Sequence, residues 1–335
     1  MGVKHKRLFI LYLVILALSC ISLFYLSLSA GSPSASFSSV FRVLTRGGES
    51  DPLLYVSIME IRMPRAIIAF FIGMMFALSG TILQDTFHNG LAGPELLGVS
   101  AGASLTMAVL TVLHLPVAFY LHPFISLAGG MAGGIVVILC TMGKANKQNM
   151  ILIGAAVSAF FQSLIIITIS IGSQNDIGLL FFYLIGSLAN RNWDHVIEIA
   201  PWFLVCVPAA LAMAKPLNVL RLGDEAAQGR GVSVVRMRTF LLFLSVSLSA
   251  AGVAVCGPVG YIAFIAPHLA RRIMGTSNTF VILPLSGLIG SCTLMGTDLS
   301  ARMLFYPQEL PVGLFTVMFG GLLLLFFLNK RRKSV

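Results

Sequence analysis

Apolar stretches of about 20 residues, the length at which a helix crosses a bilayer, recur along this 335-residue chain. The first run extends from Leu8 to Ala30 and the last from Val312 to Leu328. Charged residues make up only 10% of the sequence, whereas soluble domains contain about 25%. So little polar surface excludes a soluble globule, and so much apolar surface excludes a disordered chain. We therefore predict an all-α, polytopic membrane protein.

The apolar runs predict about ten transmembrane helices, arranged as a single transmembrane domain over residues 1–335. The predicted spans are Leu8–Ala30, Pro64–Leu83, Pro94–Leu113, Pro116–Met142, Met150–Ile171, Val196–Ala214, Thr239–Cys256, Ile262–Met274, Phe280–Met295 and Val312–Leu328. A shorter apolar segment, Ile177–Leu188, is predicted to be re-entrant or interfacial because it is too short to cross. The first run is longer than the apolar region of a signal peptide, so we expect an uncleaved first helix.

The basic residues are divided unevenly between the two sides of the predicted bundle. If the N-terminus lies inside and the spans alternate, 16 of the 22 lysines and arginines fall in inside segments and 6 in outside segments. Positive charge gathers on the cytoplasmic side of membrane proteins, so we predict that both termini are cytoplasmic. The same rule accounts for the net charge of +10, and no nucleic-acid partner is expected.

Three arginines oppose this trend because they fall on the predicted outer rim. They are Arg62, Arg65 and Arg302. Such side chains could reach lipid headgroups or pair with nearby acids, for which the sequence offers Glu60, Asp298 and Glu309. They could instead bind acidic groups of an external partner, since arginine forms charge-assisted hydrogen bonds of fixed geometry with carboxylates.

The longest predicted cytoplasmic loop covers about residues 215–238. Gly223, followed by Asp224 and Glu225, indicates a helix start, because acidic residues in a first turn suit the helix dipole. Later glycines indicate its end. The loop is either a plain connector or a short amphipathic helix that contacts a cytosolic partner.

Small residues recur at a spacing of four in three predicted spans. The pairs are Gly73 and Ala77, Gly98 and Gly102, and Gly129 and Gly133. This spacing allows helices to approach closely, so we expect a tightly packed bundle.

Known catalytic motifs are missing from the sequence. It contains no phosphate-binding loop, no HExxH and no GxSxG motif. Its cysteines and histidines show no zinc or haem spacing. We expect no enzymatic activity, no catalytic residue, no metal site and no cofactor in this chain. Few acidic residues lie deep in the predicted spans, which argues against an ion-coupled carrier without excluding it.

Five motifs, in order along the chain, resemble the FecCD family of permeases from ABC importers of iron–siderophores, haem and cobalamin. They are IRMPRAIIAFFIGMMFALSGTILQ (61–84), HNGLAGPELLGVSAGA (88–103), RLGDEAAQGRGVS (221–233), CGPVGYIAFIAPHLARRIMG (256–275) and MGTDLSARMLFYPQELPVG (295–313). The sequence departs from the family pattern at positions of packing and turn geometry, namely His88, Gly90, Ala263, Ala266 and Gly320–Leu322. These departures do not change the expected fold, but they leave the detailed shape of the translocation path undetermined.

The resemblance implies a permease subunit of an ATP-driven importer in the cell membrane. A second permease subunit, identical or paralogous, would complete the translocation path. ATP would be bound by a cytosolic ABC ATPase dimer, and a periplasmic or extracellular substrate-binding protein would dock outside. Ferric siderophores are the expected substrate, ahead of cobalamin and haem. The alternatives are an ion-coupled secondary transporter and a membrane scaffold or receptor that transports nothing.

The resemblance also implies roles for individual residues. Arginines of the family that match Arg62, Arg65 and Arg302 pair with carboxylates of the binding protein. The ATPase-coupling helix maps to about Gly223–Val232, where the residues of interest are Gly223, Asp224, Glu225, Ala226 and Gly231. The inner gate is expected in the loop between spans four and five, at Lys147, Gln148 and Asn149. Spans five and eight to ten are expected to line the path.

Overall fold

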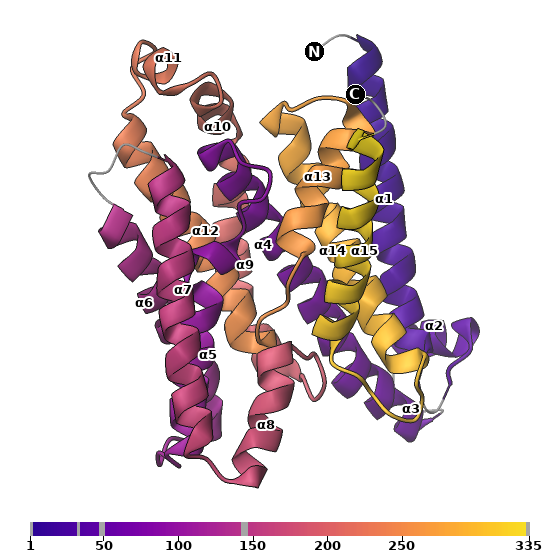
Figure 1. Cartoon of the computed structure of the whole chain (residues 1–335). Coiled ribbons are helices and arrows are strands. Elements are labelled where there is room, and N and C mark those ends of the chain that lie inside the picture. Colours follow the sequence, from indigo (N-terminus) through magenta and orange to yellow (C-terminus); the bar gives the residue numbers. More distant parts are fainter. Residues whose placement is uncertain (1–2, 32–33, 47–50, 142–146, 333–335) are drawn as a thin grey trace.

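The computed structural model describes residues 3–31, 34–46, 51–141 and 147–332, and over these residues all regular secondary structure is helical. Ten helices correspond to the ten predicted spans (Figure 1). They are α1 (Val3–Ser29), α4 (Met63–Phe87), α5 (Val99–Val112), α6 (His122–Thr141), α7 (Lys147–Ser170), α9 (Trp193–Ala212), α12 (Val234–Cys256), α13 (Ile262–Met274), α14 (Thr279–Met303) and α15 (Val312–Arg332). Seven helical stretches in the described part are long and apolar enough to cross a membrane, which confirms a polytopic, all-α protein.

Shorter helices connect these elements. They are α2 (Phe37–Arg46), α3 (Pro52–Val56), the π-helix η1 (Ser57–Arg62), the 3₁₀-helices η2 (Pro94–Leu97) and η3 (Phe119–Leu121), α8 (Gln174–Ile185), α10 (Ala214–Leu220) and α11 (Asp224–Gln228). The third predicted span is broken at Gly98, whose φ is +71°, so that η2 precedes α5. The predicted loop over 215–238 is shorter than expected, because α12 begins at Val234 and continues its backbone hydrogen bonds beyond the apolar run.

Burial separates a central group of helices from a peripheral one. In the most apolar windows of α4, α12 and α14, 78%, 83% and 67% of the residues are buried inside the chain. The corresponding share is 6% for α1 and 17% for α7. The hydrophobic core therefore lies among α4, α12 and α14, while α1 and α7 present apolar side chains outward, as contact with lipid or another subunit requires.

Glycines bring the central helices into close contact. A Cβ atom on Gly73 of α4 would overlap the backbone of Gly290 in α14, and one on Gly102 of α5 would overlap the carbonyl of Gly129 in α6. Backbone-to-backbone approach of this kind is what small residues allow in membrane bundles. It confirms the tight packing predicted from their spacing.

Helix α8 has 12 residues, which corresponds to about 18 Å and is shorter than the hydrocarbon core. Its length agrees with the predicted re-entrant or interfacial segment. The irregular backbone after α8 pairs with other segments of the chain. Ser187 N–H donates to Cys256 O at 2.8 Å, and Gly313 N–H donates to Gly186 O at 3.0 Å. Non-helical backbone at membrane depth is tolerated only with such internal partners.

The first turn of α1 and the last turn of α15 lie at the same end of the bundle as α10 and α11 (Figure 1). Helices α2, α3 and α8 lie at the opposite end. This arrangement places the helix of the predicted coupling loop on the side where the chain begins and ends. That this side is cytoplasmic stays a prediction.

Candidate functional site

A cluster of charged side chains lies where α4 and α14 meet, at the end opposite to α11. We call it the Asp298 cluster, and its members are Arg62, Arg65, Asp298, Arg302 and Glu309. Arg65 Nε and Nη2 donate to Asp298 Oδ1 at 3.0 and 2.9 Å, and its Nη1 donates to Glu309 Oε2 at 2.7 Å. Arg302 Nε lies 3.4 Å from Asp298 Oδ2. One aspartate therefore compensates two guanidinium groups.

The same cluster fixes the end of α1. Arg62 Nη1 donates to the carbonyls of Leu28 and Ser29 at 2.9 and 3.3 Å. Arg302 Nη2 donates to the hydroxyl of Ser27 at 2.6 Å and to its carbonyl at 3.4 Å. The last carbonyls of a helix have no partner within the helix, and cations are favourable there. The two arginines thus serve as a cap for α1.

All three predicted docking arginines are buried in the isolated chain, and Glu309 is the most exposed partner in the cluster, with 46% of its side chain accessible. The alternative derived from the sequence, pairing with Asp298 and Glu309, is confirmed for Arg65. Pairing with Asp298 is also confirmed for Arg302. Binding of an external protein by these arginines stays a prediction.

The predicted coupling loop contains α11, a single short helix. It begins after Gly223, whose φ of +106° favours glycine, and its first turn carries Asp224 and Glu225 as predicted. It ends at Gln228 and is therefore shorter than the predicted Gly223–Val232. Arg238 Nη2 donates to both carboxylate oxygens of Asp224, at 2.9 and 3.1 Å, and anchors the helix to α12.

One side of the α11 segment is buried against the bundle, and the other side is exposed. Ala227 is fully buried, while Glu225 and Ala226 are exposed, as is Gly231 in the turn before α12. An anchored helix with an exposed side is suited to contact another protein. The identity of that protein stays a prediction.

A second buried cluster joins α4, α10, α13 and α14 near α11. We call it the Asp85 cluster, and its members are Gln84, Asp85, Arg221, Arg271 and Thr279. Arg271 Nη2 donates to Asp85 Oδ1 at 3.0 Å, and Thr279 Oγ1 donates to Asp85 Oδ2 at 3.0 Å. Arg271 Nη1 donates to Gln84 Oε1 at 2.5 Å, and Arg221 Nε lies 3.6 Å from Asp85 Oδ1.

Sequence reasoning missed this second cluster. Asp85 was visible only as an acid near a span end, and Arg271 only as part of a longer motif. The available signal was an acid just beyond the end of one predicted span and a basic residue near the end of another, at the same predicted side of the membrane. Arg221 ends α10 and precedes Asp224 by three positions, so the Asp85 cluster is adjacent to α11 along the chain.

The predicted gate residues Lys147, Gln148 and Asn149 form the first turn of α7. Their side chains lie outside the described part of the structure. Among the described residues, no group of three or more His, Cys, Asp or Glu side chains could hold a metal ion.

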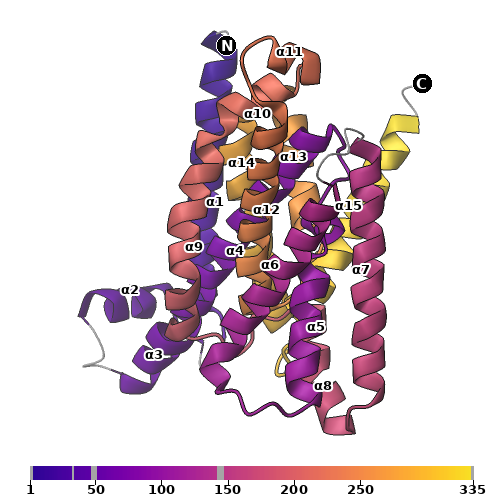
Figure 2. The same ribbon diagram turned by 90° about the vertical axis from the view of Figure 1, so that its left-hand side faces the viewer.

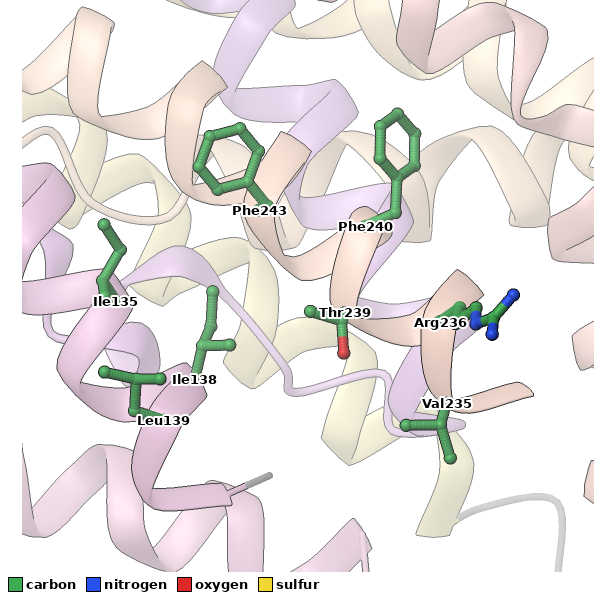
Figure 3. A pocket seen from close by; sticks show the side chains of 8 residues that line it. All are labelled: Ile135, Ile138, Leu139, Val235, Arg236, Thr239, Phe240 and Phe243. Atoms are coloured by element: carbon green, nitrogen blue, oxygen red, sulfur yellow. The ribbon is translucent and has the colours of Figure 1, made fainter. Parts of the chain in front are cut away.

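An apolar groove of about 460 Å³ lies between the end of α6 and the start of α12 (Figure 3). Its lining residues are Ile135, Ile138, Leu139, Val235, Arg236, Thr239, Phe240 and Phe243. Only Arg236 and Thr239 bring polar atoms to it, so the groove suits hydrocarbon better than a polar metal chelate. It is not a candidate for the translocation path.

The fold and the two clusters define a polytopic helical membrane protein with buried ion pairs at both ends of its central helices. Residues 2–330 match the FecCD transport family, and the chain belongs to that family. It is accordingly a multi-pass protein of the cell membrane.

Relatives and a solved structure match over most of the chain. The "Fe(3+) dicitrate transport system permease protein FecC" of Escherichia coli (strain K12) is 34% identical over 85% of this chain and 86% of its own. The "Hemin transport system permease protein HmuU" of Yersinia pestis is 34% identical over 97% and 95%. A solved metal-chelate type ABC transporter in an inward-facing conformation has a TM-score of 0.83 at 28% identity, covering 95% of this chain and 98% of that one.

Proposed function

We propose that this chain is the permease subunit of an ATP-driven importer of ferric chelates. The observation that carries the proposal is the family match over residues 2–330, with relatives named for transport of ferric dicitrate and of hemin. The likeness to a metal-chelate ABC transporter supports the same mechanism. Together they favour the ABC importer over an ion-coupled carrier. Ferric siderophores are the first substrates to test, with ferric citrate, haem and cobalamin beside them.

A second permease subunit, a copy of this chain or a paralogue, would complete the path along α7 and α15. These helices lie along the same edge of the bundle in Figure 2. Both helices expose large apolar side chains, including Phe160 and Ile166 on α7 and Val317 and Phe319 on α15. An apolar helical edge is suited to pack against a second membrane-embedded subunit, and the conduit would form between the two subunits.

Docking of a substrate-binding protein at the outer rim would use Arg65 through an exchange of partners. Arg65 Nη1 is held by Glu309, the exposed member of the Asp298 cluster. A carboxylate on the binding protein would replace that of Glu309 and form a comparable charge-assisted hydrogen bond. Arg62 and Arg302 would keep the end of α1 in place beside this contact.

Coupling to the ATPase dimer would begin at α11. The exposed residues Glu225 and Ala226 would meet the ATPase, and the pair of Asp224 with Arg238 would transmit movement to α12. Arg221 and Asp85 would transmit it to Arg271 on α13. Because α13 is one of the helices expected to line the path, ATP binding could change access to the conduit by this route.

The test is reconstitution of the chain with its ATPase and binding protein in lipid vesicles. We expect uptake of a labelled ferric siderophore that requires ATP and stops with an ATPase variant unable to hydrolyse ATP. Ferric citrate, haem and cobalamin are measured in parallel. Uptake that ignores ATP and collapses with the ion gradient would establish a secondary carrier. No flux of any chelate in the complete system would favour the scaffold.

A further inference from the structure

Helix α2 has two apolar faces, and the fold buries only one of them. Val40 and Val43 are buried in a small cluster with Leu28, Leu54 and Ile58. This cluster joins α2 to the end of α1, to α3 and to η1. It explains how α2 is held in place, while the side chains of Phe37, Phe41 and Leu44 stay exposed.

The other apolar face points away from the protein. Phe37, Phe41 and Leu44 follow one another at intervals of four and three residues and are 60%, 64% and 40% exposed. Residues so spaced share one face of a helix. The polar residues Ser38 and Arg42 lie on the flank, and the ten residues of α2 include no acid. A segment of this design is strongly amphipathic.

The placement of α2 indicates what covers its exposed face. In both views α2 lies beside the end of α1, and Figure 2 shows its axis across the direction of the long helices. Tyr25 of α1 joins the two, because its hydroxyl donates to Phe37 O at 2.6 Å and its ring stacks on that of Phe37 with centroids 5.4 Å apart. Ile21 and Leu26 of α1 are exposed, so the apolar face of α2 continues the lipid-facing surface of α1.

We propose that α2 is an in-plane membrane anchor that rests in the headgroup and acyl boundary of the bilayer. Phe37, Phe41 and Leu44 enter the apolar layer, while Arg42 reaches lipid phosphate groups. Amphipathic helices with aromatic and basic residues bind interfaces in this way. The partner is a lipid surface and not a docked protein, because the exposed stripe is continuous with α1 at the perimeter of the bundle. The anchor would fix the height of the Asp298 cluster relative to the membrane.

The experiment uses the full-length chain in lipid vesicles and two tryptophan variants. Phe41→Trp places the probe on the exposed apolar face, and Ser38→Trp, at an exposed position on the polar flank, is the matched control. The unsubstituted chain supplies the background of its two tryptophans, Trp193 and Trp202. Both variants alter exposed positions, so both are expected to fold. Fluorescence is measured with brominated phosphatidylcholine and with aqueous iodide.

We expect brominated lipid to quench Phe41→Trp at least twice as strongly as Ser38→Trp, and iodide to show the reverse order. Equal iodide quenching of the two variants, with no effect of brominated lipid, would overturn the proposal. Shielding of Phe41→Trp that develops only after a substrate-binding protein is added would also overturn it. None of these readouts requires transport, so they are independent of the proposed import function.

Discussion

The two buried clusters share their chemistry and differ in their surroundings. Each contains one buried aspartate that compensates two arginines. In the Asp298 cluster the side chains of Arg65 and Arg302 are only 7% and 8% exposed. In the Asp85 cluster those of Arg271 and Arg221 are 20% and 27% exposed, and Arg221 lies farther from the carboxylate. The first cluster therefore holds α1, α4 and α14 tightly together, and the second connects the helices beside α11 more loosely.

This difference fits the two tasks that the proposed function assigns to the two ends of the bundle. A rim that receives a binding protein needs a fixed geometry, and buried arginines that cap α1 supply one. A connection next to the proposed coupling helix α11 needs pairs that can lengthen and shorten at small cost, and partly hydrated pairs are weaker than fully buried ones. The following predictions test this contrast, from the largest expected effect to the smallest.

Asp298→Asn should cause the largest loss of stability, because Arg302 would lose its carboxylate partner and Arg65 would keep only Glu309, while both guanidinium groups stay buried. Removing one partner of a buried ion pair costs about 3–5 kcal/mol. The shift of the thermal midpoint of the purified protein in detergent measures this effect, and Asp194→Asn, at an exposed position, is the control. A midpoint as high as that of the control would show that the cluster does not stabilise the bundle.

Asp85→Asn should lower stability less, by about 1–3 kcal/mol, since water can reach both arginines. Its main effect should be on coupling. Chelate uptake per ATP hydrolysed should fall about five- to tenfold, the range of a modest coupling free energy, while ATP hydrolysis by the assembled transporter continues. If Asp85→Asn and Asp298→Asn lowered stability equally and left the uptake per ATP unchanged, the proposed distinction between the loose Asp85 cluster and the tight Asp298 cluster would be wrong.

Arg238→Gln should loosen α11 from α12 with a smaller loss of stability, about 0.5–1 kcal/mol, because Asp224 is about one-third exposed. The affinity of the permease for the ATPase dimer should fall, as measured by co-purification at increasing salt. Arg236→Gln is the matched control, since Arg236 lies on the same helix with an exposed side chain. Equal affinities for the two variants would separate α11 from ATPase binding.

Glu309→Gln should have the smallest effect on stability, below about 1 kcal/mol, because its pair with Arg65 is half exposed. The affinity of the binding protein should rise by about two- to fivefold, since Nη1 of Arg65 would keep only a neutral amide acceptor, which an incoming carboxylate displaces more easily than it displaces a carboxylate. Titration calorimetry, or binding to the immobilised permease, measures this affinity, with Glu60→Gln on η1 as control. An unchanged affinity would leave Arg65 with a purely internal role.

The sequence predicted most of the fold because the membrane imposes a simple length rule on apolar runs. The bounds of α13 agree with the prediction to the residue, and the glycines at spacing four are at close helix contacts. The predicted bounds were less accurate at helix ends outside the apolar runs. Helix α12 continues through charged residues that precede its apolar run. Gly98 breaks an apolar run that the length rule treats as one continuous helix.

The sequence by itself determined the class of protein, the polytopic helical fold and the family, since these depend on apolar length, charge distribution and short ordered motifs. Only the tertiary structure decided what the charged residues contact. Arg65 and Asp298 are 233 positions apart, and Arg271 and Asp85 are 186 apart. Such pairs depend on which helix faces meet in the bundle. Helix rotation and crossing are set by packing of the whole core, which no local pattern records.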